Sequence, residues 1–311
     1  MKIIFIRVPK HQEINSDVYK DSLVFQLIRP DDDFRYFYIE RGPPPTFEVT
    51  TEVILENRSS KKIRNIELQV YGFSSDQHQE VMETILSHGG LKEISDDRGN
   101  VVYTFKLPVL NARKKEIVKI KQRIAMKFFM IEDTKWGLVN EIPKSMIYVK
   151  GGEKGRLQTT RRQEIIQLAE KLQRGEIYDS IVNCIRYVQQ NVRYFKNYRR
   201  LGAMFALKIR KGACDEVTDL CVSIIRAMGI PARSVIGFII GGGGHAWLEV
   251  YSPKKGWIPV DPIFGMIGGL GVRWLKYFVE KIPGEKPLRL NKQFKNLYVA
   301  LRIYVNDDRL V

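Results

Sequence analysis

The 311-residue sequence predicts an α+β fold in which a β-rich half, residues 1–150, precedes a mixed half, residues 151–311. In the first half, several segments alternate apolar and polar residues with the period of two that is typical of half-buried strands. The second half begins with apolar residues at helical spacing and continues with strand-like runs. A chain of this length can form two domains, each with its own core.

The first half is expected to consist of strands connected by turns. Apolar and polar residues alternate over 47–56 and over 66–70, and the polar segment 57–60 forms the turn between them. Another alternating strand, 101–107, follows a turn that is rich in Asp and Gly, and the pattern continues over 118–124. Several short strands of this kind predict an antiparallel β-sandwich, which we expect to be immunoglobulin-like.

The charged, glycine-rich stretch Lys150–Arg156 is the expected boundary between the two halves. Two helices should follow it, because apolar residues recur every three or four positions over 165–172 and over 181–192. Such stripes generally face a core. We therefore expect both helices to pack inside the domain rather than to bind a partner.

A third helix is predicted to begin at Cys214. Apolar residues recur at helical spacing over 217–228, and Gly229 followed by Pro231 marks the end of the helix. The first N–H groups of a helix have no partner within it, and its dipole is positive at that end, so a thiolate is favoured there. The thiolate is the nucleophilic form of cysteine.

Two neighbouring strands then carry a histidine and an aspartate. A buried strand and four consecutive glycines lead to His245, which begins an alternating strand. A turn at 252–256 leads to the next strand, which ends at Asp261. Positions 245 and 261 are equidistant from position 253, so an antiparallel hairpin with its turn centred there places His245 and Asp261 opposite each other.

The chain beyond Pro262 is expected to form a tail. It is rich in glycine over 265–271, and a short helix is expected over 272–280, followed by strands near the end of the sequence. This tail is expected to cover one side of the site.

Cys214, His245 and Asp261 together supply the three groups that thiol-based acyl transfer needs: a nucleophile, a base that activates it and a carboxylate that orients the base. A cysteine or a histidine taken singly is more often a buried structural residue. The helix-start position, the glycine run and the hairpin register together favour the catalytic interpretation. A zinc site built from the same three residues is a weaker alternative.

Four motifs in this region resemble the core of the transglutaminase-like superfamily. They are the Gly-x-Cys helix start at Cys214, the segment RAMGIPAR at 226–233, the strand start HAW at 245–247, and a Gly-Trp strand that ends in Asp261-Pro262. The resemblance covers residues 212–262 and implies a papain-like α+β scaffold with Cys214 as nucleophile, His245 as base and Asp261 as orienting carboxylate. One departure is Ile263, where many members of the family have Thr.

The resemblance also implies a range of activities. Members of the family include protein cross-linking enzymes, amide hydrolases, proteases and proteins that have lost catalysis, and an intact trio argues against the last. We therefore expect a cysteine-dependent enzyme that transfers acyl groups from amide bonds of a protein or peptide substrate. Hydrolysis is favoured over cross-linking, because nothing in the sequence marks a site for an amine acceptor. The predicted sandwich agrees with the β-domain that often precedes this core.

The formal charge of +16 and the isoelectric point near 9.6 favour an anionic partner such as nucleic acid or a membrane surface. Lys and Arg are distributed along the whole chain, however, and short clusters such as 113–115 belong to no basic stripe with interleaved aromatic residues. A solvated basic surface is the simpler interpretation. A basic binding module with little or no catalysis is the alternative function.

The cysteines and the apolar segments bear on cofactors and location. Cys184, Cys214 and Cys221 are odd in number and have no paired spacing, which indicates a reducing compartment, and Cys184 and Cys221 lie on apolar helix stripes that should pack in the core. No metal-ligand spacing occurs, so no cofactor is expected. The apolar run 3–6 is too short for a signal peptide, and no segment has the length of a membrane span. We therefore expect a cytoplasmic protein.

Overall fold

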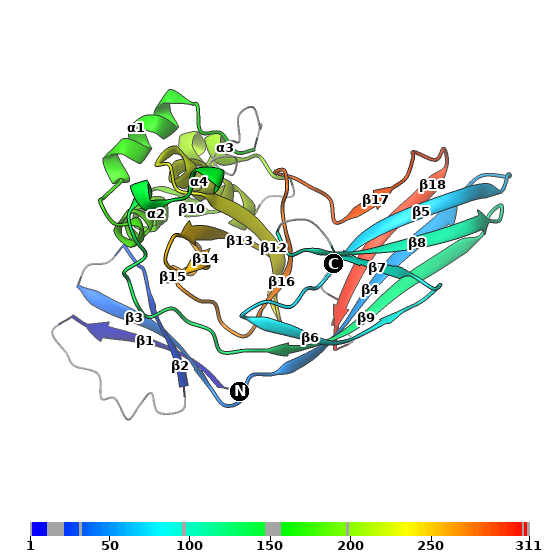
Figure 1. Ribbon diagram of the computed structural model, residues 1–311, viewed down its shortest axis with the longest axis horizontal. Coiled ribbons are helices and arrows are strands. Elements are labelled where there is room, and N and C mark those ends of the chain that lie inside the picture. Colours follow the sequence, from blue (N-terminus) through cyan, green and yellow to red (C-terminus); the bar gives the residue numbers. More distant parts are fainter. Residues whose placement is uncertain are drawn as a thin grey trace.

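The computed structural model describes residues 2–10, 22–30, 33–94, 98–146, 157–196, 199–306 and 308–309. The fold is α+β and contains an antiparallel β-sandwich, as the sequence predicts. Figure 1 shows three parts: a small N-terminal sheet, a core in which helices cover a second sheet, and a long sandwich that extends away from both. The expected boundary stretch, Lys150–Arg156, lies outside the described residues.

The β-sandwich consists of two antiparallel sheets, with strand orders β19-β18-β4-β9-β6 and β17-β5-β8-β7. Its strands are β4 (Thr46–Asn57), β5 (Ile63–Gly72), β6 (Gln79–Leu86), β7 (Leu91–Ile94), β8 (Val101–Leu110), β9 (Lys115–Met126), β17 (Leu288–Leu290), β18 (Leu297–Val305) and β19 (Asp308–Arg309). Side chains such as Val53, Leu68 and Phe105 fill the space between the sheets. The four alternating segments of the sequence all lie in these strands.

The sandwich takes strands from both ends of the chain. Strand β18 runs antiparallel to β4, with Leu297 opposite Asn57 and Val305 opposite Val49, and β17 pairs with β5. From Leu288 onward the C-terminal tail therefore completes the sandwich instead of covering the site. This pairing crosses the predicted boundary between residues 1–150 and 151–311.

The N-terminal strands form a separate sheet in the order β1-β3-β2. They are β1 (Lys2–Pro9), β2 (Ser22–Leu27) and β3 (Phe34–Arg41). Phe25 and Tyr38 of this sheet pack against Trp247 and Trp274 of the core. The sheet is thus separate from the sandwich, and its strand β2 lies beside β15 of the core (Figure 1).

Within the described ranges, the core consists of four α-helices on one five-stranded antiparallel sheet with the order β15-β14-β13-β12-β16, together with a short parallel pair of strands, β10 and β11. Its elements are the 3-10 helix η2 (Val139–Glu141), α1 (Gln163–Leu172), α2 (Ile177–Asn191), β10 (Arg193–Tyr194), α3 (Ala203–Ile209), β11 (Lys211–Gly212), α4 (Cys214–Ala227), β12 (Ala232–Ile239), β13 (Gly243–Ser252), β14 (Gly256–Asp261), β15 (Met266–Ile267) and β16 (Trp274–Val279). The two predicted helix stripes are α1 and α2, and both face the core. None of the helices in the described ranges is long and apolar enough to cross a membrane.

Strand β13 separates two hydrophobic clusters because successive side chains of a strand point to opposite faces. Leu248 and Val250 pack against α4 and the other helices. Trp247 points to the opposite face, where it meets Trp274 and the N-terminal sheet. Trp247 is 1% exposed, so it packs beneath the site rather than lining it.

The prediction of a helix over 272–280 is wrong, because residues 274–279 form strand β16 at an edge of the core sheet. Trp274, Leu275 and Phe278 are all buried, on a segment that is covered on both sides. The segment is apolar except for Lys276, and short segments of this kind cannot be distinguished from buried helices by periodicity. Pairing with β12 decides the conformation.

Candidate active site

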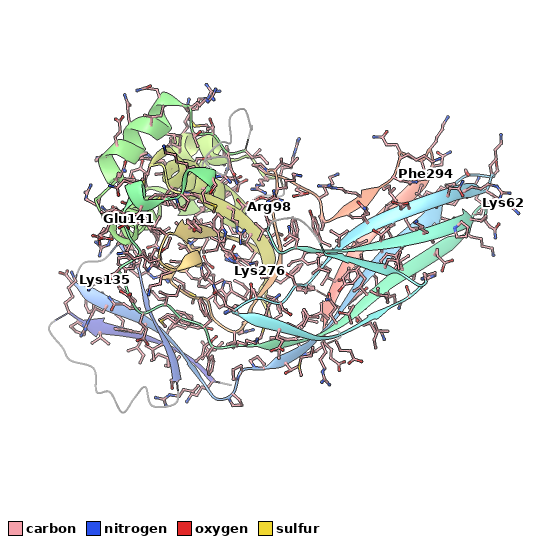
Figure 2. All side chains as sticks on the ribbon, in the orientation of Figure 1. Lys62, Arg98, Lys135, Glu141, Lys276 and Phe294 are labelled. Carbon is pink, nitrogen blue, oxygen red and sulfur yellow. The ribbon has the colours of Figure 1, made fainter. Side chains whose placement is uncertain are left out.

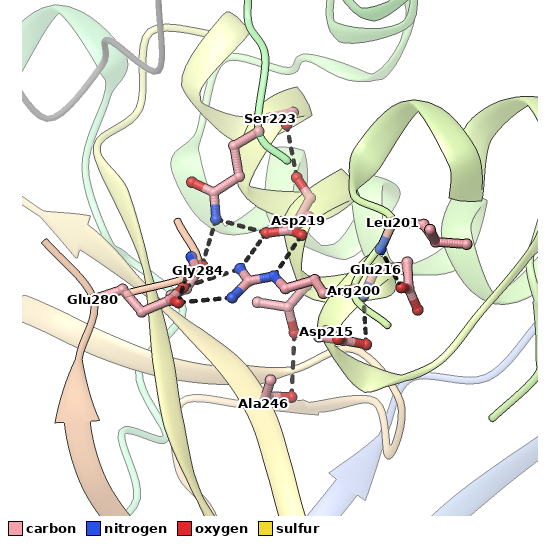
Figure 3. Close-up of polar contacts among 12 residues, drawn as sticks. Arg200, Leu201, Asp215, Glu216, Asp219, Ser223, Ala246, Glu280 and Gly284 are labelled. Carbon is pink, nitrogen blue, oxygen red and sulfur yellow. Dashed lines mark hydrogen bonds and ion pairs between the residues drawn. The ribbon is translucent and has the colours of Figure 1, made fainter. Parts of the chain in front are cut away.

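Cys214 is the first residue of α4, as the sequence predicts. The preceding residue, Ala213, has no side chain that can cap the helix, and Glu216 supplies the missing contacts. Its Oε2 accepts a hydrogen bond from the N–H of Ala213 at 2.8 Å, and its Oε1 accepts one from the N–H of Leu201 at 2.7 Å. The carboxylate is fully buried and fixes the turn that leads into Cys214 (Figure 3).

The second turn of α4 is held by a buried ion cluster. Arg200 Nη2 lies 2.5 Å from Asp219 Oδ1, and its Nη1 lies 2.7 Å from Glu280 Oε1 (Figure 3). Burial opposes the charge of this guanidinium, but the two carboxylates outweigh burial and raise the pKa of Arg200. The cluster connects α4 to the chain that leaves β16. It therefore fixes the helix relative to the sheet.

Thr218 fastens the first turns of α4 to the strand that carries the histidine. Its hydroxyl donates a hydrogen bond to the carbonyl of Ala246 at 3.2 Å, next to His245 in the sequence. Thr218 is fully buried. Helix α4 carries the candidate nucleophile and strand β13 carries the candidate base. Thr218 thus bonds these two elements to each other about one helical turn from Cys214.

His245 and Asp261 form a buried hydrogen-bonded pair, with 2.7 Å between His245 Nε2 and Asp261 Oδ2. The predicted register is wrong by two positions, however. Leu248 lies opposite Val260 and Ser252 opposite Gly256, which centres the turn at position 254 instead of 253. Asp261 is therefore a diagonal neighbour of His245 on the same face of the sheet. The side chains of such diagonal neighbours can still reach each other.

Asp261 has three further hydrogen-bond donors. Trp274 Nε1 donates to its Oδ2 at 2.9 Å, and the backbone N–H groups of Ile263 and Phe264 donate to its Oδ1 at 2.9 and 3.2 Å. Four donors hold the carboxylate in one orientation and stabilise its charge. Sequence reasoning missed Trp274, because the segment that carries it was expected to be helical. The available signal in the sequence was the position of Trp274 at the start of a segment that is rich in aromatic residues.

The protonation of His245 follows from this arrangement. Burial disfavours its positive charge, but the charge of Asp261 and the hydrogen bond to it, followed by interaction with Cys214, raise the pKa of His245 to about 10. His245 is thus an imidazolium at neutral pH, beside Cys214. An imidazolium in this position can stabilise a cysteine thiolate.

The three cysteines differ in accessibility. Cys214 is partly exposed, whereas Cys184 and Cys221 are completely buried in the helical core, as their stripes predicted. Burial, followed by contact with Cys184, raises the pKa of Cys221 and disfavours its thiolate. Of the three thiols, Cys214 therefore has the environment of a nucleophile.

The glycine run before His245 forms an open turn at the site. Gly241 and Gly243 have φ angles of +78° and +91°, which favour glycine. Around Gly243 and Gly244, no atom lies within 4 Å of the place where a side chain would begin. The backbone can therefore be approached by a ligand at these two residues. Across the described ranges, no group of three or more His, Cys, Asp and Glu residues is arranged to hold a metal ion.

Comparisons with known proteins add to this geometry. The family model of the transglutaminase-like superfamily core matches residues 166–262, which include all three candidate residues. The uncharacterized protein YebA of Bacillus subtilis is 26% identical over 184 residues, 54% of this chain and 24% of that protein. A protein-glutamine gamma-glutamyltransferase of Pseudomonas aeruginosa is 33% identical over 73 residues, 19% of this chain and 11% of that protein. The chain thus spans less than a quarter of the length of these curated relatives.

A solved structure is similar over most of the chain. It is a crystal structure of a candidate cysteine protease from Cytophaga hutchinsonii, with a TM-score of 0.59 and 13% identity over 87% of this chain and 92% of that chain. The likeness shows that the two proteins share a fold. Separately, the family-model match over residues 166–262 confirms the predicted resemblance of this part of the chain to the transglutaminase-like superfamily core.

Proposed function

We propose that the protein is a cysteine-dependent acyl-transfer enzyme that acts on amide bonds of peptides or proteins, with Cys214, His245 and Asp261 as its catalytic trio. The observation that carries the proposal is the buried bond of 2.7 Å between His245 and Asp261, on an imidazolium that interacts with Cys214 at a helix start. Nucleophile, base and orienting group are the elements of this chemistry.

The first half of the reaction forms a thioester. The Cys214 thiolate attacks the carbonyl carbon of the amide, and the resulting oxyanion accepts a hydrogen bond from the backbone N–H of Cys214, which is at the first position of α4. His245 donates its proton to the amide nitrogen as the C–N bond breaks, and the amine leaves. Asp261 keeps the imidazole ring in position throughout this step.

The second half releases the acyl group. Neutral His245 takes a proton from a water molecule, which attacks the thioester carbonyl, and the C–S bond breaks to give a carboxylic acid and the Cys214 thiolate beside the His245 imidazolium. An amine in place of water would give a new amide. We propose hydrolysis as the main outcome, because water needs no binding site of its own whereas an amine acceptor does.

Ammonia release and amine incorporation test this proposal with glutamine-containing peptides as substrates. We expect time-dependent release of ammonia or cleaved peptide, with little incorporation of a labelled primary amine. Cys214→Ala should abolish both products, whereas the matched control Cys184→Ala, which changes a thiol buried in the core, should retain them. Equal rates for the wild type and Cys214→Ala would overturn the proposed chemistry. Efficient amine incorporation would replace hydrolysis by transfer.

A further inference from the structure

A cavity of about 260 Å³ lies beside the candidate active site. Its apolar wall includes Val188 of α2, Val192 just after it and Val217 of α4, and its polar side includes Arg29 and Tyr194. Arg29, together with its neighbour Pro30, is distant in sequence from the other residues that line the cavity. It lies just after β2, in the N-terminal sheet, outside the region that matches the superfamily core.

The cavity adjoins the reacting groups on two sides. Val217 follows Cys214 by three positions on α4, so the two side chains share one face of the helix. Ile263, which also lines the cavity, donates its N–H to Asp261. Tyr194, which also lines the cavity, lies within electrostatic reach of Cys214. A substrate held at Cys214 can therefore extend into the cavity.

Backbone contacts hold Arg29 at the cavity. The N–H of Ile28 donates to the carbonyl of Gly265 at 2.8 Å, and a side chain on Gly265 would collide with the carbonyl of Ile28. The guanidinium itself makes one long hydrogen bond, 3.4 Å from its Nη1 to the carbonyl of Ile263. The loop that follows Asp261 thus fixes this segment of the N-terminal sheet next to the site.

Arg29 is a half-buried cation whose charge is available to a ligand. Among the described residues it has no carboxylate within ion-pair distance. Burial lowers the pKa of Arg29 while Asp261 opposes that effect, and an arginine in such a place stays charged at neutral pH. Asp261 does not neutralise it, because this carboxylate is bonded to His245, Trp274 and two backbone N–H groups.

We propose that this cavity is a substrate subsite for a carboxylate on a short aliphatic stem, such as a glutamate side chain next to the scissile amide, and that Arg29 determines this specificity. The three valines receive the methylene groups, and the guanidinium binds the carboxylate with its planar pair of donors. The net positive charge of the chain adds long-range attraction for acidic substrates. The inference rests on the proposed function, since it places a substrate at Cys214.

The cavity is also lined by Gln189, a second polar group that competes with Arg29 as the residue that recognises the ligand. Gln189 donates from its Nε2 to the carbonyl of Pro262 at 3.0 Å, and its buried Oε1 accepts no hydrogen bond from the described residues. An unpaired acceptor would favour a ligand with a donor, such as a glutamine carboxamide. Glutamate and glutamine are therefore the pair of ligands that decides between charge recognition by Arg29 and amide recognition by Gln189.

Two matched alkylating reagents test the proposal: N-chloroacetyl-glutamate α-amide and N-chloroacetyl-glutamine α-amide. In each, the Cys214 thiolate displaces chloride, and the C–S bond replaces the C–Cl bond. The rate is measured at Cys214 by peptide mass spectrometry in the full chain. We expect the glutamate reagent to react about tenfold faster in the wild type, as one charge-assisted hydrogen-bonded pair allows, and the preference to fall with added salt.

Variants of the arginine make the test specific. Arg29→Gln should reduce the glutamate-to-glutamine ratio to about one, and an unchanged circular dichroism spectrum and unfolding midpoint would show that the variant is folded. Arg29→Lys should restore part of the preference, because it keeps the charge without the planar donors. Arg193→Gln, which removes an exposed arginine beside Tyr194, should keep the wild-type ratio.

Three results would overturn the subsite. They are a ratio near one in the wild type, a ratio that Arg29→Gln leaves unchanged, and a preference for the glutamine reagent, which would assign recognition to Gln189. A different measurement would show that the proposed function itself is wrong. Cys214 would then react with iodoacetamide no faster than glutathione does, and the ratio for the two matched reagents would still decide whether Arg29 selects an acidic group.

Discussion

The sandwich and the core bury different kinds of polar side chains. In strands β4 to β9, the buried polar side chains that the structure describes are neutral; Asn57 and Gln122, for example, bond to backbone groups. The core buries charged groups as well as neutral ones, and the charged groups are joined in clusters, such as Arg200 with Asp219 and His245 with Asp261. Figure 2 shows Lys62 and Phe294 at the outer end of the sandwich, far from Lys135 and Glu141 beside the core.

This difference shows where the molecule places its electrostatic constraints. Neutral side chains can form hydrogen bonds with buried backbone groups at a small cost in desolvation free energy. Buried charges cost much more to desolvate and need partners in a fixed geometry. The core contains such charges around α4 and β13, the two elements that carry Cys214 and His245. We infer that the core's charged clusters position a site, whereas the sandwich is held mainly by apolar contact.

The largest effect is expected from Asp261→Asn. The amide cannot stabilise the imidazolium as a carboxylate does, so kcat/KM should fall by roughly 10⁴-fold, as in other sites where an orienting carboxylate is lost. The matched control is Glu249→Gln, which changes a buried carboxylate of β13 that is paired with Arg233 and Lys276. The control should lose stability but little activity. Equal losses of activity in both variants would mean that any buried charge of this sheet matters.

The next effect is on stability. Arg200→Met leaves two buried carboxylates without their partner, which should lower the free energy of unfolding by about 3 to 5 kcal/mol. Arg58→Met removes an exposed ion pair of the sandwich and should leave the unfolding midpoint unchanged. Urea denaturation of both variants measures the contrast. If Arg58→Met destabilised the protein as much as Arg200→Met, the two regions would not differ in the proposed way.

The pH dependence should follow the His245–Asp261 pair. The pKa of His245 in the folded protein is about 10, above its ordinary value of 6.5, so the stability that the pair contributes is fully present below pH 6.5 and is lost as pH rises toward 10. Because His245 must donate a proton to the leaving amine, kcat/KM should fall about tenfold per pH unit above pH 10. Asp261→Asn should move this alkaline limb toward neutral pH. If the alkaline limb of Asp261→Asn stayed near pH 10, the limb would reflect the titration of another group.

The sequence predicted the elements whose patterns are local. The alternation in 47–56, the start of α4 at Cys214 and the strand from His245 needed only side-chain periodicity and turn residues, and the structure has all three. The pairing of the C-terminal β18 with β4 involves strands about 250 residues apart, and no local pattern encodes such a partner.

The candidate site shows the same limit. Its three residues are recognisable from motifs, and the contact of His245 with Asp261 tolerated an error of two positions in register, because diagonal neighbours still meet. Arg29 and Trp274 could not be found in this way. One comes from the N-terminal sheet and the other from β16, and only the tertiary packing of these elements brings them to the loop after Asp261.

Trp274→Phe should give the smallest of these effects on the reaction and the most specific one. It keeps an aromatic ring in the core but removes the indole N–H that donates to Asp261, so kcat/KM should fall about tenfold, the equivalent of one hydrogen bond to a charged group. Trp136→Phe is the matched control, since Trp136 is also buried and its Nε1 donates at 2.9 Å to a backbone carbonyl, that of Asp133. Both variants should lose about 1 kcal/mol of stability. Only Trp274→Phe should also shift the alkaline limb of the pH profile downward, because only Trp274 acts on the carboxylate that holds His245. A shift in both variants, or in neither, would reduce Trp274 to a packing residue.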